Sequence, residues 1–235
     1  MKLSWRSRKG NRSRTNNDAM GCYQDNAYLV AVVVDASEKG PEGEGHALAR
    51  FWAGELIRSI RYELENGNEL STRMLYLQIK KAHQKLRPQY LCAIASYTVL
   101  SFNKHTRELL ILYCGDCLVA IESPNDERQW LIDPHHCSHQ QGLESPLFSA
   151  SRNILTRCLK ARRFEAPTVM QTNLCGHSRV LVCTDGYWAE HLASQQDWIK
   201  LEDDASVLLI SPSEHGCEYL AESDNGFFQS HLEPA

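Results

Sequence analysis

The sequence lacks any long hydrophobic run. Its main apolar run, Tyr28–Val34, is far shorter than the roughly 20 residues that a membrane-spanning helix needs. The N-terminus also lacks the apolar segment of a secretory signal. The nine cysteines are odd in number and lack the spacing of a disulfide framework. We therefore expect a cytoplasmic protein with reduced thiols and no membrane partner.

Acidic side chains are absent from the first 17 residues, which carry six basic ones. The rest of the chain holds 19 basic and 29 acidic groups, a net charge of −10, which argues against a nucleic-acid partner. No Pro-, Gly- or Ser-rich linker divides the 235 residues. We predict a basic N-terminal arm over residues 1–11 and a single domain over residues 12–235.

Runs rich in Val, Ile, Leu and Tyr predict seven β-strands. They cover Tyr28–Val34, Ser96–Phe102, Leu109–Cys114, Leu118–Glu122, Trp130–Ile132, Arg179–Cys183 and Ala205–Ile210. The short links Asn103–Glu108 and Gly115–Asp116 predict hairpins between neighbouring strands. The acidic segment near the C-terminus is interpreted as a solvated edge or a short helix.

Helical periodicity predicts three helices. The first, over about Gly45–Asn66, has an apolar residue at every fourth position: Leu48, Trp52, Leu56 and Ile60. The second runs from an N-cap at Ser71 to Leu86, and the third covers Ser151–Ala161. The order of helices and strands indicates an α+β fold, a layered sandwich with largely antiparallel sheets.

Aspartates stand beside several predicted strands. They are Asp18, Asp35, Asp116, Asp185, Asp203 and Asp204. Carboxylates that different strands bring to one point repel each other unless a cation lies between them. Oxygen ligands without paired His or Cys select Mg²⁺, Mn²⁺ or Ca²⁺ over zinc. Each aspartate alone is more typical of an ordinary turn.

Eight short motifs resemble, in order, those of the PP2C-like metal-dependent protein phosphatase (PPM) family. They are Arg14–Ala19, Val34–Ala36 with Gly43-Glu44, Ala95–Thr98, Gly115–Cys117, Asp133–His136, Asn153–Leu159, Cys183–Trp188 and Asp203–Ser206. Asn153–Leu159, for example, resembles Asn-Val-Leu-Thr-Arg-x-Leu. The resemblance covers about residues 12–210 and is to a small bacterial-type member. It implies a four-layer α/β/β/α sandwich with two central, mainly antiparallel sheets and flanking helix pairs.

The resemblance implies a metal-dependent protein serine/threonine phosphatase, which hydrolyses phosphomonoesters by attack of a metal-bridging hydroxide. Two Mn²⁺ or Mg²⁺ ions would be bound by Asp35, which bridges them, by the Ala36 carbonyl, and by Asp185 and Asp203. By the same resemblance, Asp18 would hold metal-bound water and Asp116 would help to bind a weaker third ion.

An arginine of the same family binds the phosphate. The family spacing places it at Ser13, so the resemblance assigns it to Arg14 or Arg12, and we favour Arg14. Arg14, Asp35 and Asp185 are then the implied catalytic residues. The implied partners are phosphorylated protein substrates and a Ser/Thr kinase of the same cell.

Departures from the family pattern leave an alternative open, a pseudophosphatase that binds a phosphoprotein or regulates a partner. Asn17 replaces a Glu, Ala36 replaces a Gly, and Glu38-Lys39 replace a Gly-Gly pair. Ser37 and Lys160 also depart from the pattern of some members.

A third alternative is a small redox or zinc domain. Cys114 and Cys117 form a CxxC pair, but on a predicted strand–turn–strand instead of the helix N-terminus that favours a thiolate. Zinc could be bound by the same pair together with His135, His136, Cys137 and His139.

Overall fold

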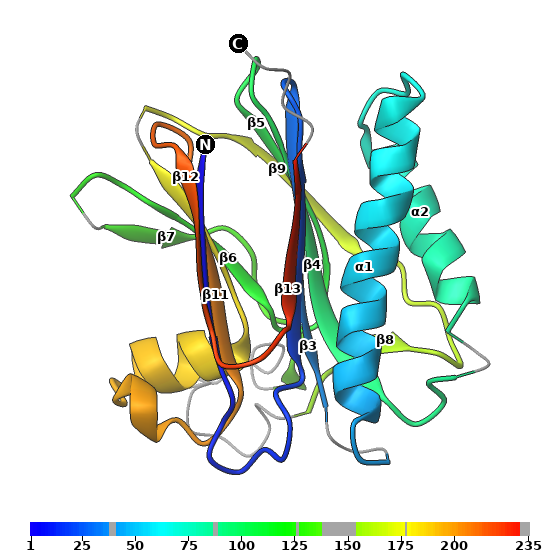
Figure 1. Cartoon of the computed structure of the whole chain (residues 1–235), viewed down its shortest axis with the longest axis vertical. Coiled ribbons are helices and arrows are strands. Elements are labelled where there is room, and N and C mark those ends of the chain that lie inside the picture. Colours follow the sequence, from blue (N-terminus) through cyan, green and yellow to red (C-terminus); the bar gives the residue numbers. More distant parts are fainter. Residues whose placement is uncertain (38–40, 87–88, 126, 138–153, 177, 231–235) are drawn as a thin grey trace.

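Two β-sheets pack face to face in the computed structural model (Figure 1). The structure describes residues 1–37, 41–86, 89–125, 127–137, 154–176 and 178–230. The six-stranded sheet has the order β12 (Gly216–Ala221), β1 (Lys2–Arg8), β11 (Ala205–Ser211), β10 (Arg179–Cys183), β6 (Leu118–Glu122) and β7 (Arg128–Trp130). The seven-stranded sheet has the order β13 (Gly226–Ser230), β2 (Asp18–Gln24), β3 (Tyr28–Ala36), β4 (Ile94–Asn103), β5 (Glu108–Cys114) and β9 (Thr168–Asn173), with β8 (Leu159–Lys160) paired to β4.

The predicted sandwich of two mainly antiparallel sheets is confirmed. Neighbouring strands pair antiparallel in both sheets, except that β12 lies parallel to β1 and β13 lies parallel to β2. β12 and β13 are far in sequence from β1 and β2, so no hairpin joins either pair and parallel pairing is possible.

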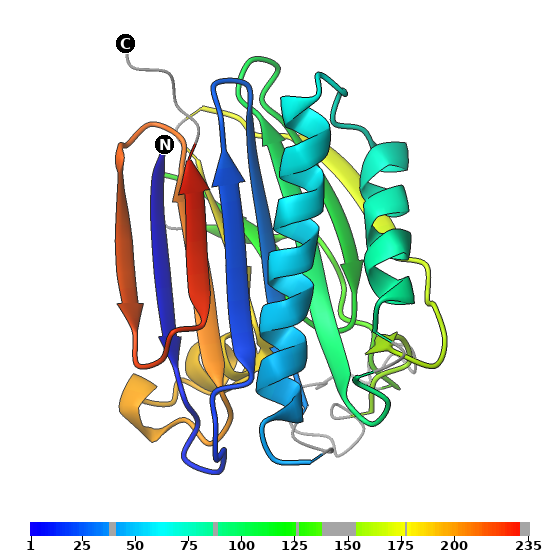
Figure 2. The same cartoon turned by 45° about the vertical axis from the view of Figure 1, so that its right-hand side comes forward.

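Helices α1 (Glu44–Glu65) and α2 (Thr72–Gln84) cover the outer face of the seven-stranded sheet (Figures 1 and 2). The predicted apolar stripe of α1 is buried against it. Ser71 caps α2 as predicted, because its side chain accepts a hydrogen bond from the Met74 backbone N–H. The helices described beside the other sheet are the short η2 (Gly186–Ala193) and η3 (Trp198–Lys200).

Alternation along β3 divides its side chains between two cores. Val30, Val32 and Val34 pack in the core beneath α1, whereas Ala31 and Val33 pack in the core between the sheets. Because successive side chains of a strand point to opposite faces, Asp35 follows Val33 on the inner face. The fold thus places this carboxylate at the end of the core between the sheets.

The predicted basic arm over residues 1–11 is wrong for seven of those residues. Lys2–Arg8 form β1, which pairs with β11 on one side and β12 on the other. Leu3 and Trp5 are buried in the core between the sheets, and the basic side chains of Lys2 and Arg6 alternate with them. The period-two pattern of a half-buried strand was concealed by the density of positive charge.

Two predictions for the middle of the chain are also wrong. The expected helix Ser151–Ala161 falls partly outside the described residues, and its described part contains β8 at Leu159–Lys160 and an isolated bridge at Leu155. The expected hairpin at Gly115–Asp116 is a crossover, because β5 belongs to the seven-stranded sheet and β6 to the six-stranded one. The hairpin at Asn103–Glu108 is confirmed.

The acidic C-terminal segment forms edge strands, of which β12 is largely exposed, so the expected solvated edge is confirmed and the short helix is not. It adds β12 to the edge of one sheet and β13 to the edge of the other, on the same side of the sandwich (Figure 2). The predicted strand at Trp130–Ile132 is shifted to Arg128–Trp130. Among the described residues, no helix combines the length and the apolar character that crossing a membrane requires.

Candidate active site

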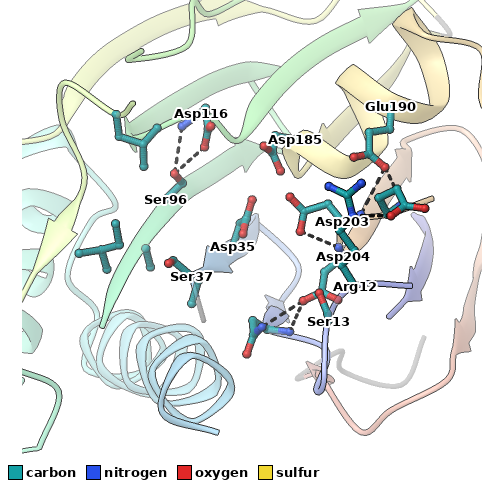
Figure 3. Close-up of a pocket in the computed structure, with 16 residues that line it drawn as sticks. Arg12, Ser13, Asp35, Ser37, Ser96, Asp116, Asp185, Glu190, Asp203 and Asp204 are labelled. Atoms are coloured by element: carbon teal, nitrogen blue, oxygen red, sulfur yellow. Dashed lines mark hydrogen bonds and ion pairs between the residues drawn. The ribbon is translucent and has the colours of Figure 1, made fainter. Parts of the chain in front are cut away.

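A pocket of about 420 Å³ opens where β3, β5 and β10 end and β11 begins. Most of the predicted aspartates lie in it, and Figure 3 shows the carboxyl groups of Asp35, Asp185 and Asp203 facing a shared space. The lining residues are Arg12, Ser13, Asn17, Asp35, Ala36, Ser37, Ile94, Ala95, Ser96, Asp116, Leu155, Asp185, Glu190, Glu202, Asp203 and Asp204.

Asp18 and Asp35 stand directly opposite each other on β2 and β3. Asp18 is fully buried behind the pocket, and its Oδ2 accepts a hydrogen bond of 3.0 Å from the Thr184 hydroxyl. No described residue donates to its buried Oδ1. Like charges placed directly across an antiparallel pair destabilise a sheet, so this arrangement is costly without a cation.

Burial and the crowding of carboxylates raise the pKa values of three aspartates. Burial raises the pKa of Asp35 well above its usual range, and Asp18, Asp185, Asp116 and Asp203 raise it further by repulsion. Burial, with repulsion from Asp204, also raises the pKa of Asp18, although the Ser206 and Thr184 hydroxyls oppose the shift. The pKa of Asp203 rises to about 8, first through burial and then through Asp185 and Asp204.

Asp185 lies two residues after β10, at the N-cap of η2, and a glycine lets η2 pass close to β11. A Cβ on Gly186 would lie 2.1 Å from the backbone oxygen of Asp204, so a larger residue would push the two segments apart. The glycine of the Asp-Gly pair therefore has a packing role. It sets the separation between the element that carries Asp185 and the turn that carries Asp203.

Asp116 is held in place by two residues that sequence reasoning did not assign to the site. The Ser96 hydroxyl donates to Asp116 Oδ1 at 2.6 Å and accepts from the Asp116 backbone N–H at 3.2 Å. The Trp188 indole N–H donates to the Asp116 carbonyl at 2.9 Å. Gly115 makes room for the contact between Ser96 and Asp116, because a Cβ on Gly115 would lie 2.1 Å from Ser96 Oγ.

The neighbouring aspartates Asp203 and Asp204 have different roles. Asp204 accepts hydrogen bonds from the backbone N–H of Gly10 at 2.9 Å and of Asn17 at 2.8 Å, so it ties the loop over residues 9–17 to the start of β11. Asp203 faces the pocket, where its Oδ1 accepts the Asp204 backbone N–H at 2.9 Å. The resemblance implied a ligand role for Asp203 and none for Asp204, but the contacts of Asp204 with this loop were not predicted.

The same loop brings Arg12, not Arg14, to the pocket. Arg12 lines it and forms an ion pair of 2.6 Å with Glu202. Arg14 does not line the pocket and pairs with Glu42 at 3.5 Å, with 75% of its side chain exposed. Close approach at Gly10, where a Cβ would lie 2.3 Å from the Asp203 backbone, fixes the path of the loop.

Glu190 is another pocket residue that no motif indicated. It projects from η2, and its Oε2 accepts the backbone N–H groups of Glu202 at 2.8 Å and Asp203 at 3.3 Å. The carboxylate therefore orders the turn in front of β11. A single glutamate in a helix carries no sequence signal of such a contact.

The donor set of the pocket fits hard divalent cations. Asp35, Asp116, Asp185 and Asp203 supply carboxylate oxygens, and no described His or Cys lines the pocket. In the described part of the chain, no three His, Cys, Asp or Glu side chains are close enough to form a preformed metal centre. The raised pKa values and the unsatisfied Asp18 Oδ1 are nevertheless what bound cations would relieve.

The structure gives the two cysteine-based alternatives little support. Cys114 and Cys117 are both buried, and burial raises the pKa of each thiol, which is the reverse of a reactive redox pair. His135 has both ring nitrogens engaged, with the Gly115 N–H at 3.1 Å and the Thr168 hydroxyl at 3.0 Å. His139, the last member of the proposed zinc cluster, lies outside the described residues.

Comparison with solved structures finds protein phosphatases. Stp1 from Staphylococcus aureus has a TM-score of 0.73 at 16% identity, over 91% of this chain and 95% of its own. The PPM Ser-Thr phosphatase MsPP from Mycobacterium smegmatis has a TM-score of 0.71 at 17% identity, over 89% and 97%. The catalytic domain of PstP in complex with two manganese ions has a TM-score of 0.64 at 14% identity, over 89% and 96%.

Comparison of the sequence with protein-family models found no match. A search of curated proteins found no match either. The shared property is therefore the three-dimensional structure: this chain has the PP2C-like fold of the PPM phosphatases, as the resemblance predicted.

Proposed function

We propose that this chain is a metal-dependent protein serine/threonine phosphatase. The observation that supports the proposal most strongly is the convergence of Asp35, Asp116, Asp185 and Asp203 on one pocket of a PP2C-like fold. The substrates would be phosphoproteins made by a Ser/Thr kinase. The metals would be Mn²⁺ or Mg²⁺, and the similar PstP domain holds two manganese ions.

Asp35, Asp185, Asp203 and the carbonyl of Ala36 would hold two cations, with Asp18 behind them and Asp116 at a third position. Bound there, the cations would lower the pKa of a water molecule and neutralise charge on the phosphate. Asp35 suits the central position because it is the carboxylate whose pKa is raised by four neighbouring aspartates.

Arg12 would bind the phosphate oxygens. Its ion pair with Glu202 is exposed, with 81% of the arginine side chain accessible, and exposed pairs are weak. A phosphate can therefore compete for the guanidinium, which offers two parallel N–H donors. The structure favours Arg12 over Arg14 for this role, because only Arg12 lines the pocket.

A covalent phosphoenzyme is not needed for this hydrolysis. The hydroxyl of Ser96 is bound to Asp116, and no histidine that could activate a serine lies among the described lining residues. The described lining contains no cysteine either. Direct attack of water on the phosphomonoester is the reaction that these side chains can support.

The test is hydrolysis of p-nitrophenyl phosphate and of a phosphothreonine peptide, with Mn²⁺ and with EDTA. We expect Mn²⁺-dependent phosphate release by the wild type and loss of release in Asp185→Ala. The matched control is Asp224→Ala, because Asp224 forms an exposed ion pair with Arg50. A folded wild type without turnover in any divalent cation would overturn the proposal in favour of the pseudophosphatase.

A further inference from the structure

The last two strands lie beyond the part of the sequence that resembles the phosphatase family. β12 and β13 add one edge strand to each sheet, and the four-residue link between them crosses from one sheet to the other (Figure 2). Arg50 of α1 pairs with Asp224 of this link, and Phe227 of β13 packs against the core beneath α1. The link also carries Asn225, which is 2% exposed.

Asn225 has every polar group engaged. Its Oδ1 accepts from the Trp5 indole N–H at 3.2 Å and from the Tyr219 hydroxyl at 3.3 Å. An indole N–H can only donate, so this contact fixes the orientation of the amide. The Nδ2 group then donates to Ser7 Oγ at 2.7 Å and to the backbone carbonyl of Asp18 at 3.0 Å.

Asn225 is connected to Asp18 in a second way, besides its direct hydrogen bond to the Asp18 backbone carbonyl. Ser7 Oγ, which accepts from Asn225, lies 2.7 Å from Ser206 Oγ. The backbone N–H of Ser206 donates to Thr184 Oγ1 at 2.9 Å, and that hydroxyl donates to Asp18 Oδ2 at 3.0 Å. Buried hydrogen bonds, joined through the covalent structure of Ser206, therefore connect the C-terminal link with the side chain of Asp18.

Asp18 is thus fixed at every polar atom but one. Its backbone N–H donates to Asn16 Oδ1 at 3.0 Å, its carbonyl accepts from Asn225, and its Oδ2 accepts from Thr184. Only the buried Oδ1 has no hydrogen bond from a described residue. An acid held in this way has a single oxygen left to direct at a ligand.

We propose that Asn225 is a positioning residue for divalent-cation binding, which acts by fixing Asp18 at the back of the pocket. The inference rests on the proposed function, because it takes Asp18 to face the cations. It assigns the C-terminal segment a role in the site: the segment closes the edge of the sandwich and orients a carboxylate. Groups that orient metal ligands in this way commonly change metal affinity by 10–100-fold when they are removed.

The test measures Mn²⁺ binding to the metal-stripped, full-length protein by titration calorimetry, together with thermal melts. Asn225→Ala should raise the Mn²⁺ dissociation constant about tenfold. Phe227→Leu is the matched control, since it weakens the packing of the same segment without touching Asp18. It should lower the melting temperature and leave the dissociation constant unchanged. Asp224→Asn, in the same link, should change neither quantity.

Equal Mn²⁺ affinity in the wild type and Asn225→Ala would overturn the inference and leave the proposed function intact. Equal loss of affinity in Asn225→Ala and Phe227→Leu would also overturn it, since general destabilisation would then explain both. A wild type that binds no Mn²⁺ would instead contradict the proposed function. Should Asn225→Ala not fold, Trp5→Phe removes one donor to Asn225 and keeps a buried ring. About threefold weaker Mn²⁺ binding is then expected, and unchanged binding would overturn the inference.

Discussion

The β2–β3 hairpin carries aspartates at both of its ends, and their carboxylates are satisfied differently. At the turn, Asp25 Oδ1 accepts the backbone N–H groups of Ala27 at 2.8 Å and Tyr28 at 2.7 Å. At the open end, Asp18 and Asp35 face each other across the strands, and Asp18 Oδ1 has no described partner. A strand-end aspartate therefore serves a turn when backbone N–H groups bind it. It indicates a ligand site when another carboxylate faces it.

The largest expected effect comes from removing the charge of one carboxylate at the open end of the hairpin. Asp35→Asn should lower Mn²⁺-dependent phosphate release by more than about 10³-fold, because it removes a proposed cation ligand and its charge. The same substitution should raise the melting temperature of the metal-free protein, since it relieves repulsion across the strand pair. Phosphate release and melts in EDTA measure the two effects. Retained turnover in Asp35→Asn would show that the carboxylate pair is not the site.

The second effect is stabilisation by the cation itself. Mn²⁺ at about 100 times its dissociation constant should add about 2.7 kcal/mol to the free energy of unfolding. Urea unfolding with Mn²⁺ and with EDTA measures the difference. Asp25→Ala should show the same increment as the wild type, whereas Asp35→Asn should show less. Equal increments in all three proteins would place the cation elsewhere.

The third prediction distinguishes the roles of Arg12 and Arg14, the two arginines of the loop over residues 9–17. Arg12→Ala should lower kcat/KM for a phosphothreonine peptide by about tenfold, about 1.4 kcal/mol, because it removes the proposed charged contact to the phosphate. Arg14→Ala is the matched control and should leave kcat/KM nearly unchanged, since Arg14 pairs with Glu42 outside the pocket lining. The reverse result would restore the assignment to Arg14.

Much of the fold could be predicted from the sequence where burial sets the pattern. The stripe of α1 and the run Tyr28–Val34 were located because apolar side chains recur at the period of a helix or fill a strand buried on both faces. Lys2–Arg8 was missed because three of its seven side chains are basic, although Leu3 and Trp5 alternate correctly. β12 was missed because an edge strand is mostly exposed and carries little apolar signal.

The site was predictable in its residue types but not in its contacts. Motif order brought Asp35, Asp116, Asp185 and Asp203 into one set, and the structure brings these four to one pocket. The resemblance selected Asp203 and not Asp204 as a ligand, but no local pattern encodes the hydrogen bonds that Asp204 accepts from two backbone N–H groups of a distant loop. Contacts between residues far apart in sequence, such as that of Asn225 with Asp18, require the fold itself.

The smallest expected effect comes from the turn end of the hairpin. Asp25→Ala removes the acceptor of two backbone N–H groups and should lower the free energy of unfolding by about 1 kcal/mol, measured by urea unfolding. Mn²⁺-dependent turnover should stay at the wild-type level, because the change lies at the far end of both strands. The control Asn26→Ala, at an exposed turn position, should change neither quantity. A loss of turnover in Asp25→Ala would mean that the two ends of the hairpin are coupled. The hydrogen bonds that a strand-end aspartate accepts would then no longer distinguish an aspartate of a turn from one of a ligand site.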